Sequence, residues 1–148
     1  MRIHINIGSN QGDRRALIGQ AVALIASAWP DARMRLSRPV ESEPWGYESP
    51  HRFLNLGVML DTDAPCEPHD VLRRLLAIER RVGGGAPHRG ADGAYCDRPV
   101  DIDLIAVDRL CLSTPDLTLP HPRARLRPFV MHPLHELDPL TASWLESL

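Results

Sequence analysis

The chain contains no lysine, and all 17 of its permanently basic side chains are arginine. This absence excludes a phosphate-binding loop built around a lysine and any mechanism that proceeds through a lysine Schiff base. Arginine is then the permanently charged group available to bind a phosphate, and its planar guanidinium suits a pair of phosphate oxygens. The formal net charge of −2 and the lack of a basic run give no indication of a nucleic-acid partner.

Cysteine is scarce as well. Cys66, Cys96 and Cys111 are far apart and form no C-x-x-C pair, so we expect reduced thiols in a cytoplasmic protein. No apolar run approaches the roughly 18 residues that a membrane-spanning helix needs, and we expect no membrane partner. With 148 residues, 43% of them hydrophobic and 24% charged, the chain is expected to form one globular domain over residues 1–148 and to be a monomer.

Hydrophobic periodicity predicts alternating strands and helices. The predicted strands cover residues 2–7, 33–43, 53–61 and 98–105, and the predicted helices run from Asp13 to about Ser27 and from about Glu67 to Val82. This βαββαβ order is typical of a ferredoxin-like α+β sandwich, whose helices cover one face of the sheet and leave the other for a site. Beyond it we expect a C-terminal hairpin with its turn at Asp108 and Arg109, and short helices near 129–137.

Two acidic residues alternate with apolar residues in the fourth predicted strand. Asp101 and Asp103 therefore share one face of that strand, roughly 6–7 Å apart. Their mutual repulsion favours a bound cation, and Mg²⁺ commonly takes one or two carboxylates together with substrate phosphates. Arg98 lies three residues earlier and adds an anion-binding group. The alternative is a solvated edge strand with an arginine that forms a salt bridge.

Two segments without periodicity flank these elements. Residues 41–52 combine proline and glycine with Trp45 and Tyr47, whose rings either plug the end of the sheet or face a ligand. On the next strand, Phe53 and Asn55 share the face opposite the predicted core. The glycine-rich segment 83–97 is long for a compact domain and is typical of a lid.

Six short motifs lie at these positions. They are Ile7-Gly8-Ser9-Asn10, Pro44-Trp45-Gly46, Phe53-Leu54-Asn55, Ile78-Glu79, Arg98-x-x-Asp101-x-Asp103, and Leu119-Pro120-His121-Pro122 followed by Arg127-x-Phe129. Taken together, the motifs resemble those of the 6-hydroxymethyl-7,8-dihydropterin pyrophosphokinase family. These folate-pathway enzymes transfer a pyrophosphoryl group from ATP to a pterin alcohol, and the resemblance covers nearly the whole chain.

The resemblance implies a role for each matching position. Asp101 and Asp103 would hold two Mg²⁺ ions that bridge the α- and β-phosphates of ATP, and with Arg98 and Arg127 they would form the catalytic set. The implied ATP-binding residues are Glu79, Arg98, Thr118, His121 and Arg127. The implied pterin-binding residues are Ser42, Trp45, Asn55 and the rings of Phe53, Tyr95 and Phe129.

The chain also departs from the family pattern. Gly84 stands where the family usually has an arginine, which Arg89 could replace, and Asp97 is expected to add a third negative charge beside the phosphate site. These departures keep open a non-catalytic or specialised pterin- or nucleotide-binding paralogue. A zinc hydrolase using His121, His132 and His135, a nucleotidyltransferase and an RNA-binding module are weaker alternatives, because each lacks the spacing or the aromatic residues that its class requires.

Overall fold

An antiparallel sheet forms the centre of the molecule. The structure, a computed structural model, describes residues 1–84, 90, 93 and 95–148. The strand order is β2-β4-β1-β5, and β3 also pairs with β4. These strands are β1 (Arg2–Ser9), β2 (Arg33–Leu36), β3 (Val40–Ser42), β4 (Phe53–Asp61) and β5 (Asp101–Val107). Because helices cover this sheet, the predicted α+β class is confirmed.

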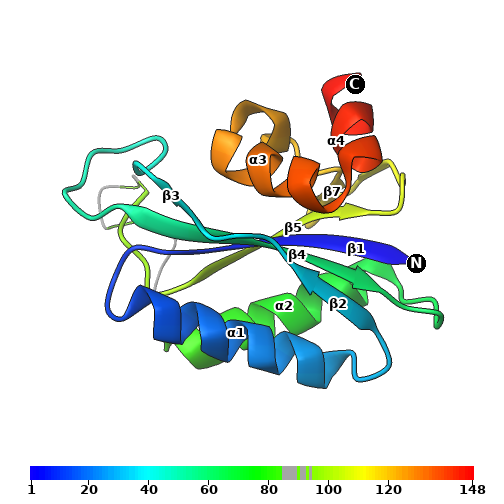
Figure 1. Cartoon of the computed structure of the whole chain (residues 1–148), viewed down its shortest axis with the longest axis horizontal. Helices are drawn as coiled ribbons and strands as arrows, with labels where there is room; N and C mark the ends of the chain where they lie inside the picture. The colour runs from blue at the N-terminus through cyan, green and yellow to red at the C-terminus, as the bar shows by residue number, and fades with distance from the viewer. Residues whose placement is uncertain (85–89, 91–92, 94) are drawn as a thin grey trace.

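Two long helices cover one face of the sheet, α1 (Arg14–Ala28) and α2 (Pro68–Gly83) (Figure 1). Ile3, Ile7 and Leu60 of the strands and Ile25 of α1 are fully buried in this core. Each such side chain stabilises the fold by roughly 1.5–3 kcal/mol relative to an exposed position. The predicted bounds of both helices are close to the observed ones, because caps mark them. The Asp13 carboxylate accepts the Ala16 N–H at α1, and Gly84 ends α2 in the left-handed conformation at φ 65°.

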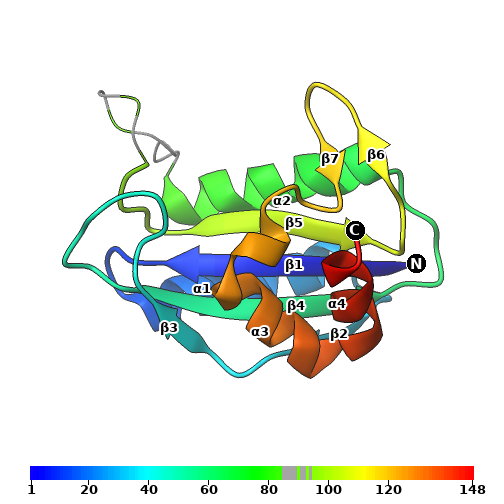
Figure 2. The same cartoon turned by 90° about the horizontal axis from the view of Figure 1, so that it is seen from above.

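The second face of the sheet is partly covered as well. There α3 (Pro128–Leu137) and α4 (Pro139–Glu146) pack against Ile105 through residues such as Val130 and Leu145. The sequence indicated the first of these helices and missed the second. On this face α3 lies over the middle of the sheet and α4 towards one end, and no helix among the described residues covers the other end, next to β3 (Figure 2).

The predicted strand over residues 33–43 is two strands, so that prediction is wrong in its extent. The chain leaves the sheet at Ser37, whose hydroxyl accepts the Gly57 N–H at 2.8 Å while its own N–H donates to the Gly57 carbonyl at 2.9 Å. Arg38 then donates its N–H to the carboxylate of Glu136 on α3, and Pro39 has no N–H to donate. The interruption attaches β2 and β3 to different parts of β4.

The strand after the predicted C-terminal hairpin turn pairs with a different strand from the one expected. A tight turn does occur at Asp108 and Arg109, but the strand that follows pairs with a later segment and not with β5. This small sheet consists of β6 (Leu112–Ser113) and β7 (Thr118–Leu119), and the 3-10 helix η1 (Ala124–Leu126) leads into α3. Among the described residues, no helix has both the length and the apolar character needed to cross a membrane.

A buried polar network attaches α4 to the sheet. The Asp138 carboxylate accepts hydrogen bonds from the Thr141 hydroxyl at 2.6 Å and from Arg2 at 3.2 Å, and it lies 3.0 Å from His4 Nε2. Burial opposes ionisation of Asp138, yet these donors outweigh it and lower its pKa to about 2. Asp138 is also the N-cap of α4, so one carboxylate holds β1 and α4 together.

We expect Asp138→Ala to lower the free energy of unfolding at pH 7 by about 2–4 kcal/mol, because it leaves buried donors without an acceptor. Because the folded pKa lies below the ordinary value of 3.8, the ionised Asp138 stabilises the fold above that pH. This contribution is lost as the pH falls towards 2. Urea unfolding measures the change, with exposed Asp116→Ala as the matched control, and equal stability of the two variants would contradict the assignment.

Candidate active site

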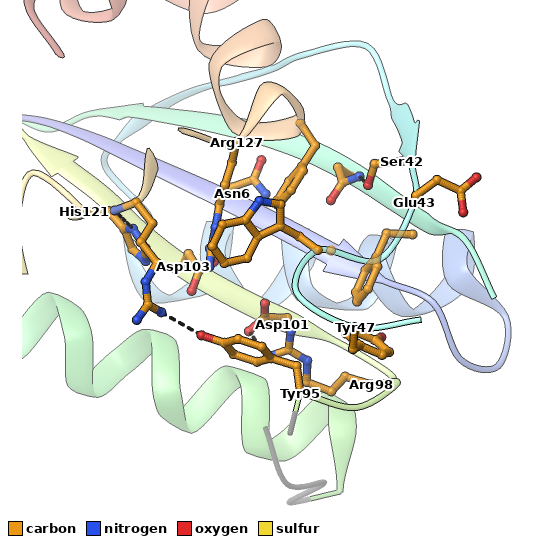
Figure 3. Close-up of a pocket in the computed structure, with 16 residues that line it drawn as sticks. Asn6, Ser42, Glu43, Tyr47, Tyr95, Arg98, Asp101, Asp103, His121 and Arg127 are labelled. Carbon is orange, nitrogen blue, oxygen red and sulfur yellow. Dashed lines mark hydrogen bonds and ion pairs between the residues drawn. The ribbon is translucent and has the colours of Figure 1, made fainter. Parts of the chain in front are cut away.

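A pocket of about 200 Å³ lies at the end of the sheet that α3 and α4 leave open (Figure 3). It receives side chains from β1, β4, β5, the loop after β3 and the segment that enters α3. All but two of the site residues that the sequence indicated line this pocket. They are Ser42, Trp45, Phe53, Asn55, Tyr95, Arg98, Asp101, Asp103, His121, Arg127 and Phe129.

The register of the sheet places the acid pair in this pocket. Asp101 lies opposite Gly8 and Asp103 lies opposite Asn6, so both carboxylates are on the face away from α1 and α2. Arg98 Nη1 is 3.2 Å from Asp101 Oδ1, and Arg127 Nη1 is 3.5 Å from Asp103 Oδ2. Figure 3 shows Arg127 extending towards Asp103 from the side of α3. Each acid therefore has an arginine partner at hand.

The pair also fits a hard divalent cation. Two carboxylates share one side of β5 and face a polar pocket with room for a phosphate-bearing molecule. Within the described ranges, no three His, Cys, Asp or Glu side chains gather as a complete ligand set. A metal held here would therefore complete its shell with water and phosphate oxygens. The zinc alternative finds no support, and His135 instead pairs with Glu146 of α4.

His121 forms part of the pocket wall as a neutral imidazole. The backbone N–H of Arg123 donates to His121 Nδ1 at 3.2 Å, which leaves the proton of the neutral ring on Nε2. Burial, followed by the charges of Arg127 and Arg123, lowers the pKa of His121 to about 4. The ring can therefore donate one hydrogen bond to a phosphate oxygen at neutral pH without itself carrying a charge.

We expect the free protein to keep His121 neutral from pH 8 down to about 5, because its pKa lies near 4. A proton-detected ¹⁵N NMR titration of the histidine rings measures this directly and also reports the tautomer. His121→Gln, which can still offer an N–H, should keep more activity than His121→Leu. A titration midpoint for His121 near 6.5 would contradict the assignment.

Aromatic rings form the opposite wall. The Arg127 guanidinium lies 4.5 Å from the centre of the Trp45 ring and 5.8 Å from that of Phe129. Trp45 in turn lies 6.5 Å from the ring of Tyr95. The rings of the 41–52 loop therefore face the pocket, which decides between the two interpretations that the sequence left open.

Asn55 has a fixed orientation in the pocket floor. Its Nδ2 donates to Ser42 Oγ at 2.8 Å and to the Val40 carbonyl at 3.1 Å. Its Oδ1 faces Gly8, where a Cβ would lie only 3.2 Å from it and 3.3 Å from the Phe53 ring. Gly8 therefore leaves space beside an amide oxygen and an aromatic ring, which is a suitable surface for a flat heterocycle with N–H groups.

Two predicted nucleotide-binding residues lie outside the pocket lining. Glu79 is 9% exposed on α2, and its carboxylate accepts the N–H of Ile102, between the two acids of β5, at 2.7 Å. Thr118 is exposed on β7. Asp97 does not line this pocket either, and its carboxylate accepts hydrogen bonds from Asn10, Tyr47 and Ser49. Arg89 and most of the predicted lid lie outside the described residues.

Four residues that line the pocket were not singled out as site residues from the sequence: Asn6, Gly8, Glu43 and Arg123. Tyr47 also lines the pocket, and the sequence left its ring either facing a ligand or plugging the end of the sheet. Asn6 could have been found, because it alternates with the isoleucines of β1 and so lies on the face away from the core. Its place opposite Asp103 depends on strand register, which the sequence does not give. Arg123 donates to the Tyr95 hydroxyl at 2.6 Å across the pocket mouth, a contact between distant segments.

The fold and site define an α+β protein with a pocket that combines the paired carboxylates of Asp101 and Asp103, three arginines and several aromatic rings. Residues 4–139 match the family described as 7,8-dihydro-6-hydroxymethylpterin-pyrophosphokinase (HPPK). The 2-amino-4-hydroxy-6-hydroxymethyldihydropteridine pyrophosphokinase of Porphyromonas gingivalis is 39% identical over 138 residues, which cover 93% of this chain and 90% of that protein. The proteins of the same name from Bacillus subtilis and Mycobacterium tuberculosis are 34% and 35% identical, over 90% and 93% of this chain and 76% and 73% of their own lengths.

The chain belongs to the 7,8-dihydro-6-hydroxymethylpterin-pyrophosphokinase family. The activity of this family is pyrophosphate transfer from ATP to 6-hydroxymethyl-7,8-dihydropterin, a step of folate biosynthesis.

Proposed function

We propose that the pocket between β5, the 41–52 loop and the segment entering α3 is where this chain carries out pyrophosphoryl transfer from ATP to 6-hydroxymethyl-7,8-dihydropterin. The observation that carries the proposal is the acid pair, Asp101 and Asp103, facing Arg98 and Arg127 in a pocket with an aromatic wall. The acids and arginines suit a nucleotide triphosphate with its metal, and the rings and Asn55 suit the pterin.

The chemistry requires position and charge neutralisation more than a covalent partner. The hydroxyl oxygen of the pterin forms a bond to the β-phosphorus and releases its proton to water, the bond from that phosphorus to the oxygen of the α-phosphate breaks, and AMP leaves. Arg98 and Arg127 neutralise the charge that moves onto the phosphate oxygens, and His121 donates its Nε2–H to one of them. No side chain needs to become covalently attached.

Asp101 and Asp103 are the residues that would hold magnesium, which we propose as two ions. Bound there, magnesium would neutralise the bridging phosphate oxygens and align the leaving group. If the two acids held a cation, their partners Arg98 and Arg127 would be available to bind the phosphates. Glu79 fits an indirect role in this arrangement, because its hydrogen bond to Ile102 fixes the strand between the acids.

Asn55 and Ser42 are the proposed pterin-recognition pair. The amide oxygen of Asn55 would accept an N–H of the pterin ring, and Ser42 holds the amide so that this oxygen stays in the pocket. The ring itself would lie among Phe53, Phe129 and Tyr95. Thr118 remains a proposed contact to the nucleotide outside the pocket core.

The strand order, with β1 between β4 and β5 and β2 at the edge, supports a ferredoxin-like arrangement for the βαββαβ core. We propose one domain over residues 1–148, a monomer, and a cytoplasmic location. Three free cysteines fit that location.

Metal dependence tests the proposed role of the acid pair. We expect turnover to cease when magnesium is chelated and to rise with more than the first power of the Mg²⁺ concentration when it is restored. Pterin binding, measured by isothermal titration, should remain without metal. Full activity in the presence of chelator would remove magnesium from the proposal, and pterin binding without any turnover would identify a binding paralogue.

A further inference from the structure

Asp97 lies where three pocket-forming segments meet. Its Oδ1 accepts hydrogen bonds from Asn10 Nδ2 and from the Tyr47 hydroxyl, both at 2.9 Å. Its Oδ2 accepts one from the Ser49 hydroxyl at 3.0 Å, and the His51 ring lies 3.9 Å away. These donors belong to the turn after β1 and to the 41–52 loop, so one carboxylate joins both to the segment before β5.

Asn10 completes this junction, which we call the Asp97 node and which comprises Asp97, Asn10, Tyr47 and Ser49. The Asn10 side-chain oxygen accepts the Arg98 N–H at 2.8 Å, and the Asn10 N–H donates to the Arg98 carbonyl at 3.2 Å. Its amide also donates to the Tyr47 hydroxyl at 3.0 Å. The backbone of Arg98 is therefore held from both sides by the residue that also binds Asp97.

The node favours a carboxylate. Two oxygens meet three donors, and an ionised carboxylate accepts at both oxygens, whereas an amide has one acceptor oxygen and would force the Ser49 hydroxyl to turn and accept. Partial burial opposes ionisation of Asp97, but the bonds from Ser49, Tyr47 and Asn10 outweigh it and keep its pKa below the ordinary value. The negative charge of Asp97 is therefore stabilised by these three hydrogen bonds and is not directed into the pocket.

The pocket depends on what the node holds. Arg98 follows Asp97 directly, and its guanidinium pairs with Asp101. Tyr47 contributes to the pocket lining, and Trp45 lies two residues earlier in the same loop. If the node were loosened, the phosphate-binding arginine and the aromatic wall would both be free to shift.

We propose that Asp97 is a positioning residue for the transfer reaction, holding Arg98 and the 41–52 loop in the geometry that binds ATP and pterin together. This inference rests on the proposed function, which assigns Arg98 to phosphate binding and the aromatic wall to pterin binding. It gives Asp97, which departs from the family pattern, a structural role as an anchor that accepts three hydrogen bonds.

The test compares Asp97→Asn with Asp116→Asn, the same chemical change at an exposed aspartate outside the pocket. We expect Asp97→Asn to raise the KM for ATP and for the pterin by about tenfold or more each, as the loss of hydrogen bonds to a charged group would cause. The kcat should fall less than either KM rises, because the metal-binding acids and Arg127 are untouched. Both KM values within twofold of the Asp116→Asn control would overturn the proposal.

Ser49→Ala gives a second test in case Asp97→Asn does not fold. Ser49 is outside the pocket lining, and its hydroxyl donates to Asp97 while it accepts the His51 N–H of its own loop at 3.1 Å. We expect a change in both KM values of about threefold in the same direction, and no further change when it is added to Asp97→Asn. Independent, additive effects would contradict a shared node.

The Tyr47 phenol supplies a readout that does not depend on turnover. Burial, followed by its bond to Asp97, raises the pKa of Tyr47 to about 12. Asp97→Asn should lower that pKa measurably in an ultraviolet titration carried out in a Tyr95→Phe background, which leaves one tyrosine. An unchanged Tyr47 pKa would overturn the node. A wild-type protein that forms no AMP would instead overturn the proposed function, while this titration still judges the node.

Discussion

Asp103→Asn should reduce magnesium-dependent AMP formation by about a thousandfold or more. The reason is that Asp103 is one of two carboxylates proposed to hold the metal, and metal stabilisation of transferring phosphates contributes several kcal/mol to the transition state. The fold should be little affected, because the substitution keeps the shape of the side chain and removes repulsion from Asp101. Steady-state AMP formation and urea unfolding measure the two effects separately.

Direct binding gives this prediction a second measurement. Mn²⁺ binding in the presence of ATP, followed by electron paramagnetic resonance, should weaken in Asp103→Asn and stay unchanged in Asp116→Asn. Asp116 is exposed and outside the pocket, so it reports the cost of removing one carboxylate in general. Turnover in Asp103→Asn within tenfold of the wild type would refute the metal assignment.

Arg127→Met should lower kcat/KM for ATP by about a hundredfold while changing pterin affinity less than fivefold. Arg127 is buried between the rings of Trp45 and Phe129 and reaches Asp103, so its charge is directed at the phosphate site. Methionine keeps an unbranched apolar side chain between the rings and removes the charge, which isolates the electrostatic contribution. ATP kinetics and pterin titration supply the two numbers.

Arg125→Met is the matched control, because Arg125 is an exposed arginine two residues away and does not line the pocket. Its kinetics should equal those of the wild type within twofold. An equal loss of ATP turnover and pterin affinity in Arg127→Met would move Arg127 from the phosphate site to the aromatic wall. No loss in either would exclude it from the site.

The sequence correctly predicted that Asp101 and Asp103 lie on one face of their strand. This prediction needs no knowledge of the neighbouring strands, because side chains alternate between the two faces of any strand. The same reasoning placed Phe53 and Asn55 opposite the core, where the pocket is found. Helix caps such as Asp13 carry their signal locally, which explains why the helix bounds could be predicted closely. The binding roles assigned to the acid pair, Phe53 and Asn55 remain predictions.

Contacts between distant segments could not be predicted in this way. The break at Ser37 depends on its bonds to Gly57, twenty residues away. The packing of α4 on the second face includes the contact between Asp138 and His4, which are 134 residues apart in sequence. The hydrogen bonds of Asp97 could not be predicted for the same reason, because their donors Asn10, Tyr47 and Ser49 lie 48 to 87 residues away in sequence.

Pyrophosphoryl transfer by this protein is tested by incubating it with ATP, Mg²⁺ and 6-hydroxymethyl-7,8-dihydropterin and separating the nucleotides by chromatography. We expect AMP to form only when the pterin is present, in an amount equal to the pterin diphosphate produced. No ADP should accumulate, because two phosphates move as one group. Pterin-dependent ADP, or no nucleotide product while the pterin is bound, would contradict pyrophosphoryl transfer in this pocket.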